Sequence, residues 1–267
     1  LPWRIDVSGG VRYTYEDKAG AFDSRVSGGL ATGNATLISR KLSILRPQSY
    51  DAAVTDGSVS GRTMVAWHAT DDAMPYWSWS RGYKSGGINM SGLPLTPANQ
   101  PALTTAAIKP EENTTIEVGA KTRWLGERLT LNLAYFDTVV RDYQANVVDT
   151  GPGALRGYIA NIAEVRVHGV EFDGALRLTR GVALYLNGAW NDGEYASYRN
   201  APCPLERIAA ATTACDLSGR PLPSLPKWSF STGAEYSHPL ALAGYAGSAY
   251  LRADANVRTR VFGEASD

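Results

Sequence analysis

A two-residue alternation of apolar and polar side chains runs through long stretches of this sequence, and it constrains the fold more than any other feature. It is clear in the windows 5–15, 117–124, 129–135, 170–178, 182–190, 228–236 and 247–257. These windows contain 11 charged residues, and all of them fall on the polar face. Because successive side chains of a strand point to opposite sides, the pattern predicts strands with one apolar and one polar face.

The alternating segments are long, and the connections between them differ in length in a regular way. Strands are expected over 3–16, 59–70, 75–86, 113–124, 128–148, 158–178, 182–196, 226–238 and 246–258. Most reach the roughly 9–11 residues that a tilted membrane strand needs, whereas soluble strands average about 5–6. Tight turns are expected at 71–74, 125–127 and 179–181, long connections at 17–58, 87–112 and 197–225, an intermediate one at 149–157 and a shorter one at 237–245. Tight turns at one end and long loops at the other are typical of outer-membrane barrels.

Composition narrows the class of protein further. The 267 residues carry 26 basic and 26 acidic side chains, and this balance argues against a strongly basic nucleic-acid-binding protein. No run of about 18 apolar residues occurs, which excludes a helical membrane protein. The 7 Trp and 14 Tyr far outnumber the 5 Phe, and aromatic rings with a polar group suit boundaries between apolar surroundings and water.

No arrangement of side chains points to catalysis or to a resident metal. The three histidines, His68, His168 and His238, each lack a second ligand at metal-binding spacing. The carboxylates are spread over separate strands, and the glycine-rich stretch 81–87 lacks the spacing of a phosphate-binding loop. We therefore predict a protein that is not an enzyme, with no catalytic residues, no metal ligands and no cofactor.

A series of short motifs follows one another along nearly the whole chain. They are Arg81-Gly82-Tyr83-Lys84-Ser85-Gly86-Gly87-Ile88-Asn89, Lys109-Pro110-Glu111, the alternating Glu117, Gly119 and Lys121, the segment 125–129, Asn161 and Ala163 before Gly169-Val170-Glu171, and Gly219 to Pro223 with Pro226. In this order they resemble the barrel of TonB-dependent outer-membrane receptors. The resemblance implies a barrel of about 22 strands, plugged by an N-terminal domain. It also implies uptake of scarce, bulky ligands, usually ferric siderophores, with energy passed from the inner membrane through TonB.

The predicted fold is therefore all-β, a transmembrane antiparallel barrel in the outer membrane of a Gram-negative bacterium. We expect residues 1–267 to be an internal part of that barrel, with the plug domain and the C-terminal closing strands absent from this chain. The expected partners are outer-membrane lipid, a small-molecule ligand, and the plug domain and TonB complex through parts missing here, but no nucleic acid. A ferric siderophore is the favoured ligand, with cobalamin and oligosaccharide open. The alternatives are a passive porin-like or adhesin-like barrel and a soluble carbohydrate-binding β-sandwich.

Ligand capture is expected in the loops and the upper lumen. The candidate residues are Arg81, Tyr83, Lys84, Tyr143, Tyr158, Tyr195, Tyr198 and Arg199. Arg and Lys can pair with an anionic ferric chelate, and aromatic rings can stack on a catecholate or a porphyrin. The competing interpretation is that these aromatic residues only line the rim of the barrel.

Two further expectations concern the cysteines and the faces of the strands. Cys203 and Cys215 lie in the connection 197–225, on the outer side of the membrane, where an oxidising environment favours a disulfide that shapes the loop; two unpaired thiols are the alternative. Leu131, Leu133, Leu184, Leu186, Phe230 and Leu251 are expected to face lipid, and Lys121, Glu171, Asp173 and Arg252 to face the lumen. Burial of the leucines in a closed core would instead indicate the soluble alternative.

Overall fold

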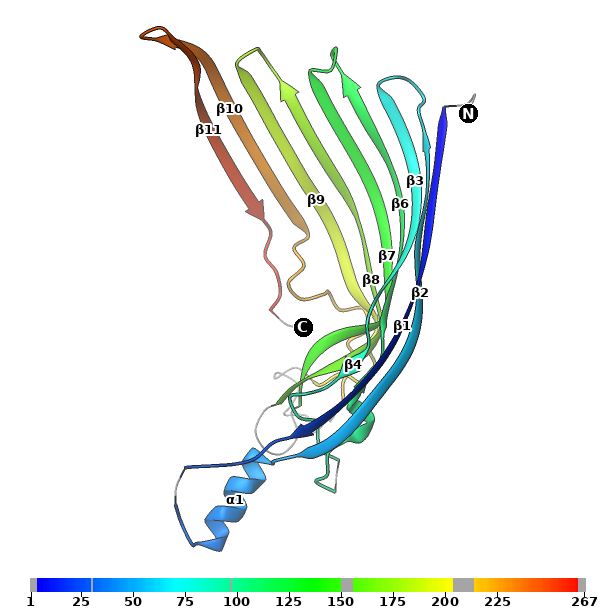
Figure 1. The fold of residues 1–267 in the computed structure, drawn as a ribbon, viewed down its shortest axis with the longest axis vertical. Helices are drawn as coiled ribbons and strands as arrows, with labels where there is room; N and C mark the ends of the chain where they lie inside the picture. Colours follow the sequence, from blue (N-terminus) through cyan, green and yellow to red (C-terminus); the bar gives the residue numbers. More distant parts are fainter. Residues whose placement is uncertain (1–3, 30, 97, 150–155, 204–213, 264–267) are drawn as a thin grey trace.

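Nine strands form one antiparallel sheet in the computed structural model of the chain (Figure 1), which describes residues 4–29, 31–96, 98–149, 156–203 and 214–263. The strands are β1 (Ile5–Asp23), β2 (Ser49–Trp67), β3 (Ala73–Lys84), β6 (Glu111–Trp124), β7 (Leu129–Asp149), β8 (Arg156–Arg177), β9 (Val182–Ser197), β10 (Trp228–Leu242) and β11 (Tyr245–Arg258). They neighbour one another in chain order, and β1 and β11 are the two edges of the sheet. This arrangement confirms the predicted antiparallel all-β architecture.

The two ends of the sheet carry different kinds of connection, as the sequence predicted. The turns 68–72, 125–128, 178–181 and 243–244 lie at one end, at the top of Figure 1. Positive φ angles at Leu125, Gly126 and Glu127, and at Ala243 and Gly244, let the chain reverse there within a few residues. The connections 24–48, 85–110 and 198–227 lie at the other end, which in a barrel of this kind is the extracellular one.

Two strand pairs are longer than the sequence analysis predicted, and one connection contains an unpredicted helix. β1 and β2 pair without interruption from Ile5↔Trp67 to Asp23↔Ser49, so the predicted loop 17–58 shrinks to 24–48. β10 likewise continues to Leu242, and the predicted connection 237–245 is a turn at 243–244. On β1 and β2 the apolar face ends before the strands do, since Asp17 lies on the same face as Val11, and a strand that extends into water no longer needs an apolar face.

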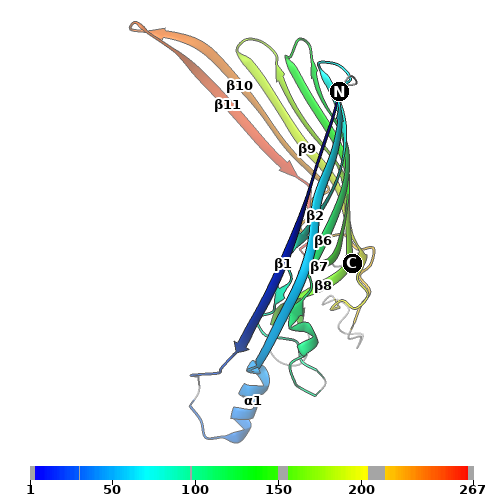
Figure 2. The same ribbon diagram turned by 45° about the vertical axis from the view of Figure 1, so that its right-hand side comes forward.

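The loop between β1 and β2 contains the helix α1 (Ala35–Leu45), which begins at Asn34. The Asn34 side chain accepts hydrogen bonds from the backbone N–H groups of Thr36 and Leu37, at 2.9 and 3.3 Å, as an N-cap does. Figure 2 shows this helix beyond the ends of β1 and β2. Among the described residues, no helix has the length and apolarity needed to cross a membrane.

The residues predicted to face lipid and those predicted to face the lumen lie on opposite surfaces of the sheet. Cross-strand register places Leu131, Gly174, Leu186, Thr232 and Ala255 in one row on the apolar face. The neighbouring row on the polar face contains Lys121, Asn132, Asp173, Asn187, Ser231 and Asn256. Phe230 and Leu251 fall on the first face, and Glu171 and Arg252 on the second.

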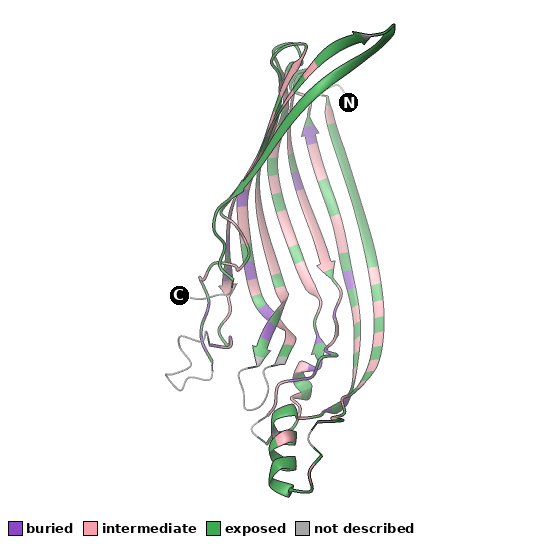
Figure 3. Cartoon of the chain, turned by 90° about the vertical axis from the view of Figure 1, so that its left-hand side faces the viewer, coloured by how far each residue is buried: buried purple, intermediate pink, exposed green. Residues whose placement is uncertain are grey.

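The apolar face is open rather than packed. Leu131, Leu133 and Leu251 are 45%, 54% and 73% exposed, as expected of side chains that meet lipid instead of a protein core. Figure 3 shows the edge strand β11 exposed along its length and the other strands, β10 included, changing between exposed and intermediate. This result rules out the soluble sandwich, in which these leucines would be buried between two sheets.

Glycines on the strands make room for aromatic rings of the neighbouring strands. Gly188 of β9 lies opposite Phe172 of β8 and Phe230 of β10. A Cβ atom at Gly188 would lie 2.6 Å from one ring and 2.7 Å from the other, closer than real contacts allow. The two rings, with centroids 6.1 Å apart, therefore cover the glycine and fill the apolar face.

The connection between β3 and β6 folds back onto the sheet. It contains β4 (Gly87–Ile88), the 3-10 helix η1 (Leu103–Thr105) and β5 (Ala107–Ile108), and β4 pairs with β5. Gln48 donates to the carbonyl of Leu93 and accepts from its N–H, both at 2.7 Å, and Leu93 is fully buried. The Tyr50 hydroxyl donates to the carbonyl of Asn89 at 2.6 Å. These contacts hold the connection against the ends of β1 and β2.

Candidate functional site

Charged side chains appear on the outward face of the sheet only near its extracellular end. On β7, Leu129, Leu131, Leu133 and Tyr135 point outward, and Asp137 and Arg141 follow them on the same face. Asp137 pairs with Arg166, and Arg141 with Glu164 at 3.6 Å. Because a charge facing lipid costs roughly 2–4 kcal/mol, the first outward ion pairs mark where the strands leave the membrane.

Arg81 belongs to this outward band of ion pairs. It lies opposite Gly61 of β2 and Thr114 of β6, on the same face as the exposed Val11. One guanidinium nitrogen donates to both carboxylate oxygens of Glu112, at 2.7 Å each. The structure therefore places this candidate ligand residue on the outer surface, already paired with an acid.

Four of the predicted tyrosines come together near the extracellular ends of β7, β8 and β9. Tyr195 is 6% exposed and packs against Ile162, Val165 and Tyr143. Its ring centroid lies 5.2 Å from that of Tyr198. Tyr158 is close enough to Tyr198 for the two phenols to interact electrostatically. We call Tyr143, Tyr158, Tyr195 and Tyr198 the tyrosine cluster.

The tyrosine cluster is a source of hydrogen-bond donors rather than of charge. Burial raises the pKa of the Tyr198 phenol well above its usual value, because the phenolate would lose its hydration. The hydroxyl therefore stays protonated at neutral pH. A protonated phenol on a partly buried ring can stack on a flat ligand and donate one hydrogen bond to it.

The segment after β9 and the segment before β10 form an irregular hairpin that carries Tyr198. The Leu217 N–H donates to the Tyr198 carbonyl at 2.9 Å, and Ala201 and Cys215 exchange two backbone hydrogen bonds of 3.0 and 2.9 Å. In the connection predicted at 197–225, backbone hydrogen bonds thus continue the pairing of β9 beyond the end of that strand. The regular pairing is interrupted between Leu222 and Trp228, where β10 begins. The tip of the hairpin, 204–213, lies outside the described residues.

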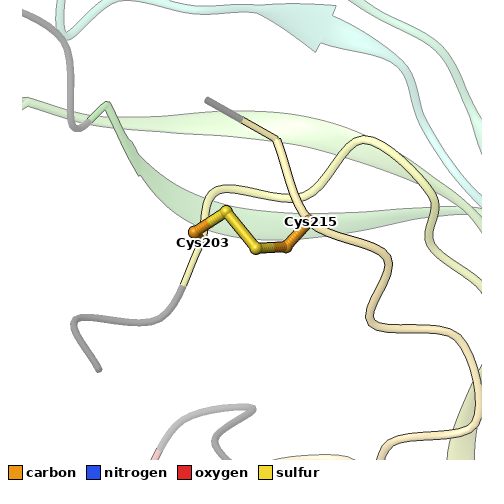
Figure 4. The surroundings of a disulfide bond; sticks show 2 residues. All are labelled: Cys203 and Cys215. Carbon is orange, nitrogen blue, oxygen red and sulfur yellow. A yellow bond between two sulfur atoms is a disulfide. The ribbon is translucent and has the colours of Figure 1, made fainter. Parts of the chain in front are cut away.

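A disulfide joins Cys203 to Cys215 across this hairpin, with the two Cα atoms 5.0 Å apart (Figure 4). This is the pairing expected from the sequence. Both cysteines are buried with Ala201 and Leu217, and Tyr198 packs against this group. The disulfide therefore supports the position of Tyr198 and lies outside the hydrogen-bonded barrel strands.

The remaining candidates do not join the tyrosine cluster. Tyr83 and Lys84 end β3, which is separated from β9 by β6, β7 and β8. Tyr83 is half-buried and Lys84 is exposed. Arg199 is exposed and lies close enough to Asp216 to help lower the pKa of that carboxyl, although hydrogen bonds from Ser218 are the larger cause.

Amide side chains within the motifs hold the β3–β6 connection to the barrel wall, a role that the sequence analysis missed. The Asn89 amide donates to the carbonyls of Thr105 and Ile159 at 2.7 and 2.9 Å and accepts from the Ile159 N–H at 2.8 Å. Asn161 accepts from the Lys109 N–H at 2.9 Å and donates back to the Lys109 carbonyl at 3.0 Å. These motif residues therefore join a connection to β8 instead of meeting a ligand.

The described residues contain no group of three or more His, Cys, Asp or Glu side chains that could hold a metal ion. His68 pairs with Asp6 at 2.7 Å, and His168 lies edge-on to Trp190 with centroids 5.7 Å apart. The chemistry that the site offers is ring stacking, hydrogen bonding and ion pairing.

Comparison with known proteins identifies the family. The model of the TonB-dependent receptor-like β-barrel family matches residues 1–266. The chain belongs to this family. Its members are transport receptors of the Gram-negative outer membrane, not enzymes, so the predicted class and location are confirmed.

Individual relatives agree with this assignment. The probable TonB-dependent receptor BfrD of Bordetella pertussis is 26% identical over 221 residues, which are 82% of this chain and 26% of BfrD. The ferric yersiniabactin uptake receptor FyuA of Yersinia pestis has the same fold, with a TM-score of 0.67, 18% identity, and coverage of 98% of this chain and 33% of FyuA. The copper transporter OprC also has this fold, with a TM-score of 0.60, 14% identity, and coverage of 88% of this chain and 31% of OprC. The chain thus spans about a quarter to a third of these proteins.

Proposed function

We propose that this chain is part of a receptor that takes up a ferric siderophore across the outer membrane with energy supplied through TonB. The observation that carries the proposal is the tyrosine cluster. It places phenol rings at the extracellular end of a TonB-dependent receptor barrel, under a hairpin closed by a disulfide. Stacking and hydrogen bonding are the interactions that a rigid aromatic chelate such as a catecholate offers.

The comparisons support this ligand class without selecting it. FyuA is a ferric yersiniabactin receptor and OprC is a copper transporter, and both share the fold at under 20% identity. The fold alone therefore cannot distinguish a siderophore from another metal ligand, and the choice rests on the side chains. The chain itself requires no cofactor in this proposal, because the iron arrives as cargo.

The proposal includes partners beyond this chain. Residues 1–267 form an internal part of the barrel, and the plug domain, the TonB-contacting segment and the closing strands are supplied by other parts of the receptor. The polar lumen face carries Lys121, Glu171, Asp173 and Arg252, and this mixture of signs suits a polar folded plug better than an ion-selective pore.

The test is uptake of radioactive iron by cells grown under iron starvation. Deletion of the receptor gene should abolish uptake from at least one defined ferric siderophore in a panel of catecholates, hydroxamates and carboxylates. Restoring the gene should restore uptake, and Tyr198→Ala with Tyr195→Ala should reduce it at least tenfold at normal surface expression. Uptake that persists without TonB would instead support a passive porin-like barrel.

A further inference from the structure

The outer end of β8 extends past the end of its neighbour β9. The pairing of these two strands begins at Glu164↔Ser197, so residues 156–162 of β8, which pair with β7 on one side, extend beyond β9 on the other. The backbone N–H and C=O groups along such an edge need other hydrogen-bond partners. Tyr158 of the tyrosine cluster lies in this segment, so the groups that bond to the edge also hold the backbone that carries its ring.

The β3–β6 connection bonds to that edge with side chains instead of a strand. The Asn89 amide nitrogen donates to the Ile159 carbonyl at 2.9 Å, and the amide oxygen accepts from the Ile159 N–H at 2.8 Å. The Ser91 hydroxyl donates to the Gly157 carbonyl at 3.0 Å. Gly157 and Ile159 are the chain neighbours of Tyr158, so the connection fixes the backbone on both sides of this tyrosine.

Asn89 is itself held in place. Its side chain is buried, at 2% exposed, and its amide nitrogen also donates to the Thr105 carbonyl at 2.7 Å. The backbone carbonyl of Asn89 accepts from the Tyr50 hydroxyl of β2 at 2.6 Å. A carboxylate at this position could not donate to the carbonyls of Thr105 and Ile159. Asn89→Asp would therefore release the edge of β8 with almost no change of shape.

A second amide acts in the same way beside Tyr143 of β7. Asp142 has a positive φ of 49°, which residues other than glycine rarely adopt, and the pairing of β7 with β8 skips it. The Asn161 amide nitrogen donates to the Asp142 carbonyl at 2.8 Å and to the Lys109 carbonyl at 3.0 Å. The Gln144 amide also donates to the Lys109 carbonyl, at 3.0 Å. The end of the connection thus fixes the chain on both sides of Tyr143.

The other half of the cluster has a different support. Tyr195 and Tyr198 belong to β9 and to the hairpin that follows it, which is closed by backbone hydrogen bonds and by the Cys203–Cys215 disulfide. The cluster is therefore assembled from two pairs of rings, and each pair is fixed by its own segment of chain.

We propose that the β3–β6 connection positions Tyr143 and Tyr158 in the tyrosine cluster, with Asn161 and Asn89 as the positioning residues. Asn89 holds the backbone beside Tyr158, and Asn161 holds the backbone beside Tyr143. The proposal rests on the proposed function, because it takes the cluster as the ligand-binding surface and states what holds its rings in place. The connection acts on the ligand through these rings and does not need to touch it.

The experiment nitrates the purified full-length receptor with tetranitromethane in detergent and assigns the product to each tyrosine by mass spectrometry. Asn89→Asp should raise the nitration rate of Tyr158 at least threefold and leave that of Tyr198 unchanged. Replacing Cys203 and Cys215 by Ser should have the opposite pattern. A general loss of stability would not separate the two tyrosines in this way.

A second variant tests the proposal even if the buried substitution prevents folding. Asn161 is only partly buried, and Asn161→Asp should raise the nitration rate of Tyr143 at least threefold, because the Asp142 carbonyl loses its donor. Tyr245 is 82% exposed beside the turn at the opposite end of the sheet, so its nitration rate is the internal reference and should stay constant.

Asn99→Asp is the matched control within the same connection. Asn99 is exposed, and its side-chain oxygen accepts from Arg46 Nη1 at 2.9 Å, which a carboxylate can also do. Equal nitration of Tyr158 in the Asn89 and Asn99 variants, or a rise at Tyr245 as large as that at Tyr158, would overturn the proposal. Nitration needs no ligand and iron uptake is measured separately, so failure of the proposed function and failure of this positioning role give different results.

Discussion

The part of the sheet inside the membrane and the part beyond it are made from the same strands but follow different rules. On β7 the outward positions from Leu129 to Tyr135 are apolar, whereas Asp137 and Arg141 on the same face are charged and paired. The backbone ladder does not change at this boundary, and only the solvent does. The difference shows that the side-chain pattern of a barrel strand reports its surroundings, while the hydrogen-bonded register extends past them.

The largest expected effect comes from placing a charge on the lipid side of this boundary. Leu133→Arg should destabilise the folded receptor by about 2–4 kcal/mol, because the guanidinium would face lipid. Ile116→Arg is the control, since Ile116 lies on the same face directly opposite Asp137 and a new arginine there can pair with it. Urea titration of folding into vesicles measures both. Equal destabilisation by the two variants would mean that the boundary is misplaced.

The disulfide should matter outside the membrane and not within it. Replacing Cys203 and Cys215 by Ser removes a cross-link that closes a loop of sequence separation 12, worth about 3 kcal/mol to the ordered hairpin. The barrel's unfolding midpoint should stay unchanged, while ligand affinity falls. A variant that fails to form the barrel would contradict this division.

The same variant has a consequence for the titration of Tyr198. Burial raises the pKa of this phenol in the folded protein. The stability that comes from burying Tyr198 is therefore fully present below the ordinary tyrosine pKa of about 10. It is lost as the pH rises above that value, because the unfolded chain then releases the phenol proton more readily than the folded protein does. Opening the hairpin should return the pKa toward the ordinary value. Ultraviolet titration, taken as the difference from Tyr198→Phe, measures the shift. No change after loss of the disulfide would show that other contacts bury Tyr198.

A smaller effect is expected from crowding the glycine beneath the paired phenylalanines. Gly188→Val should cost about 1–3 kcal/mol, because its side chain would collide with Phe172 and Phe230. Gly247→Val is the control, since a Cβ atom there meets nothing within 4 Å. Thermal unfolding in detergent compares the two, and a similar loss in both would point to a backbone effect instead of crowding.

The smallest effect should come from the outward ion pairs. Glu112→Gln leaves Arg81 without its acid, but both side chains are about two-fifths exposed. Exposed pairs contribute about 0–1 kcal/mol, so the unfolding midpoint should move little and less still at high salt. If Glu112→Gln lowered the stability of the barrel as much as Leu133→Arg does, the outward ion pairs would instead be a main source of the barrel's stability.

The sequence predicted most of the structure of the part inside the membrane, but only some features of the part outside it. The lipid-facing and lumen-facing sets, the tight turns and the cysteine pairing all depend on local pattern or on short separations. The outer ends of β1 and β2 were misplaced because charged residues such as Asp17 interrupt the apolar face there, and the end of β10 was misplaced at the opposite side of the sheet, beside the turn 243–244. The helix at 35–45 was missed because its 11 residues, about three turns, lie inside a segment that was interpreted as one long loop.

The candidate ligand residues show the same division. The eight were selected by residue type near the strand ends, and pattern alone could not say that Tyr143, Tyr158, Tyr195 and Tyr198 meet while Arg81 turns outward. That result depends on the stagger between β7, β8 and β9 and on the return of the hairpin that carries Tyr198.

The sequence by itself determined the face of each side chain within the membrane, since an alternation of period two leaves only two choices and lipid rejects one of them. Only the tertiary structure decided which side chains from different strands and connections come together outside the membrane. There water accepts either face, so the local pattern no longer restricts the chain. The arrangement then depends on long-range contacts such as those between Asn89 and Ile159, and between Tyr195 and Tyr198, which no single segment encodes.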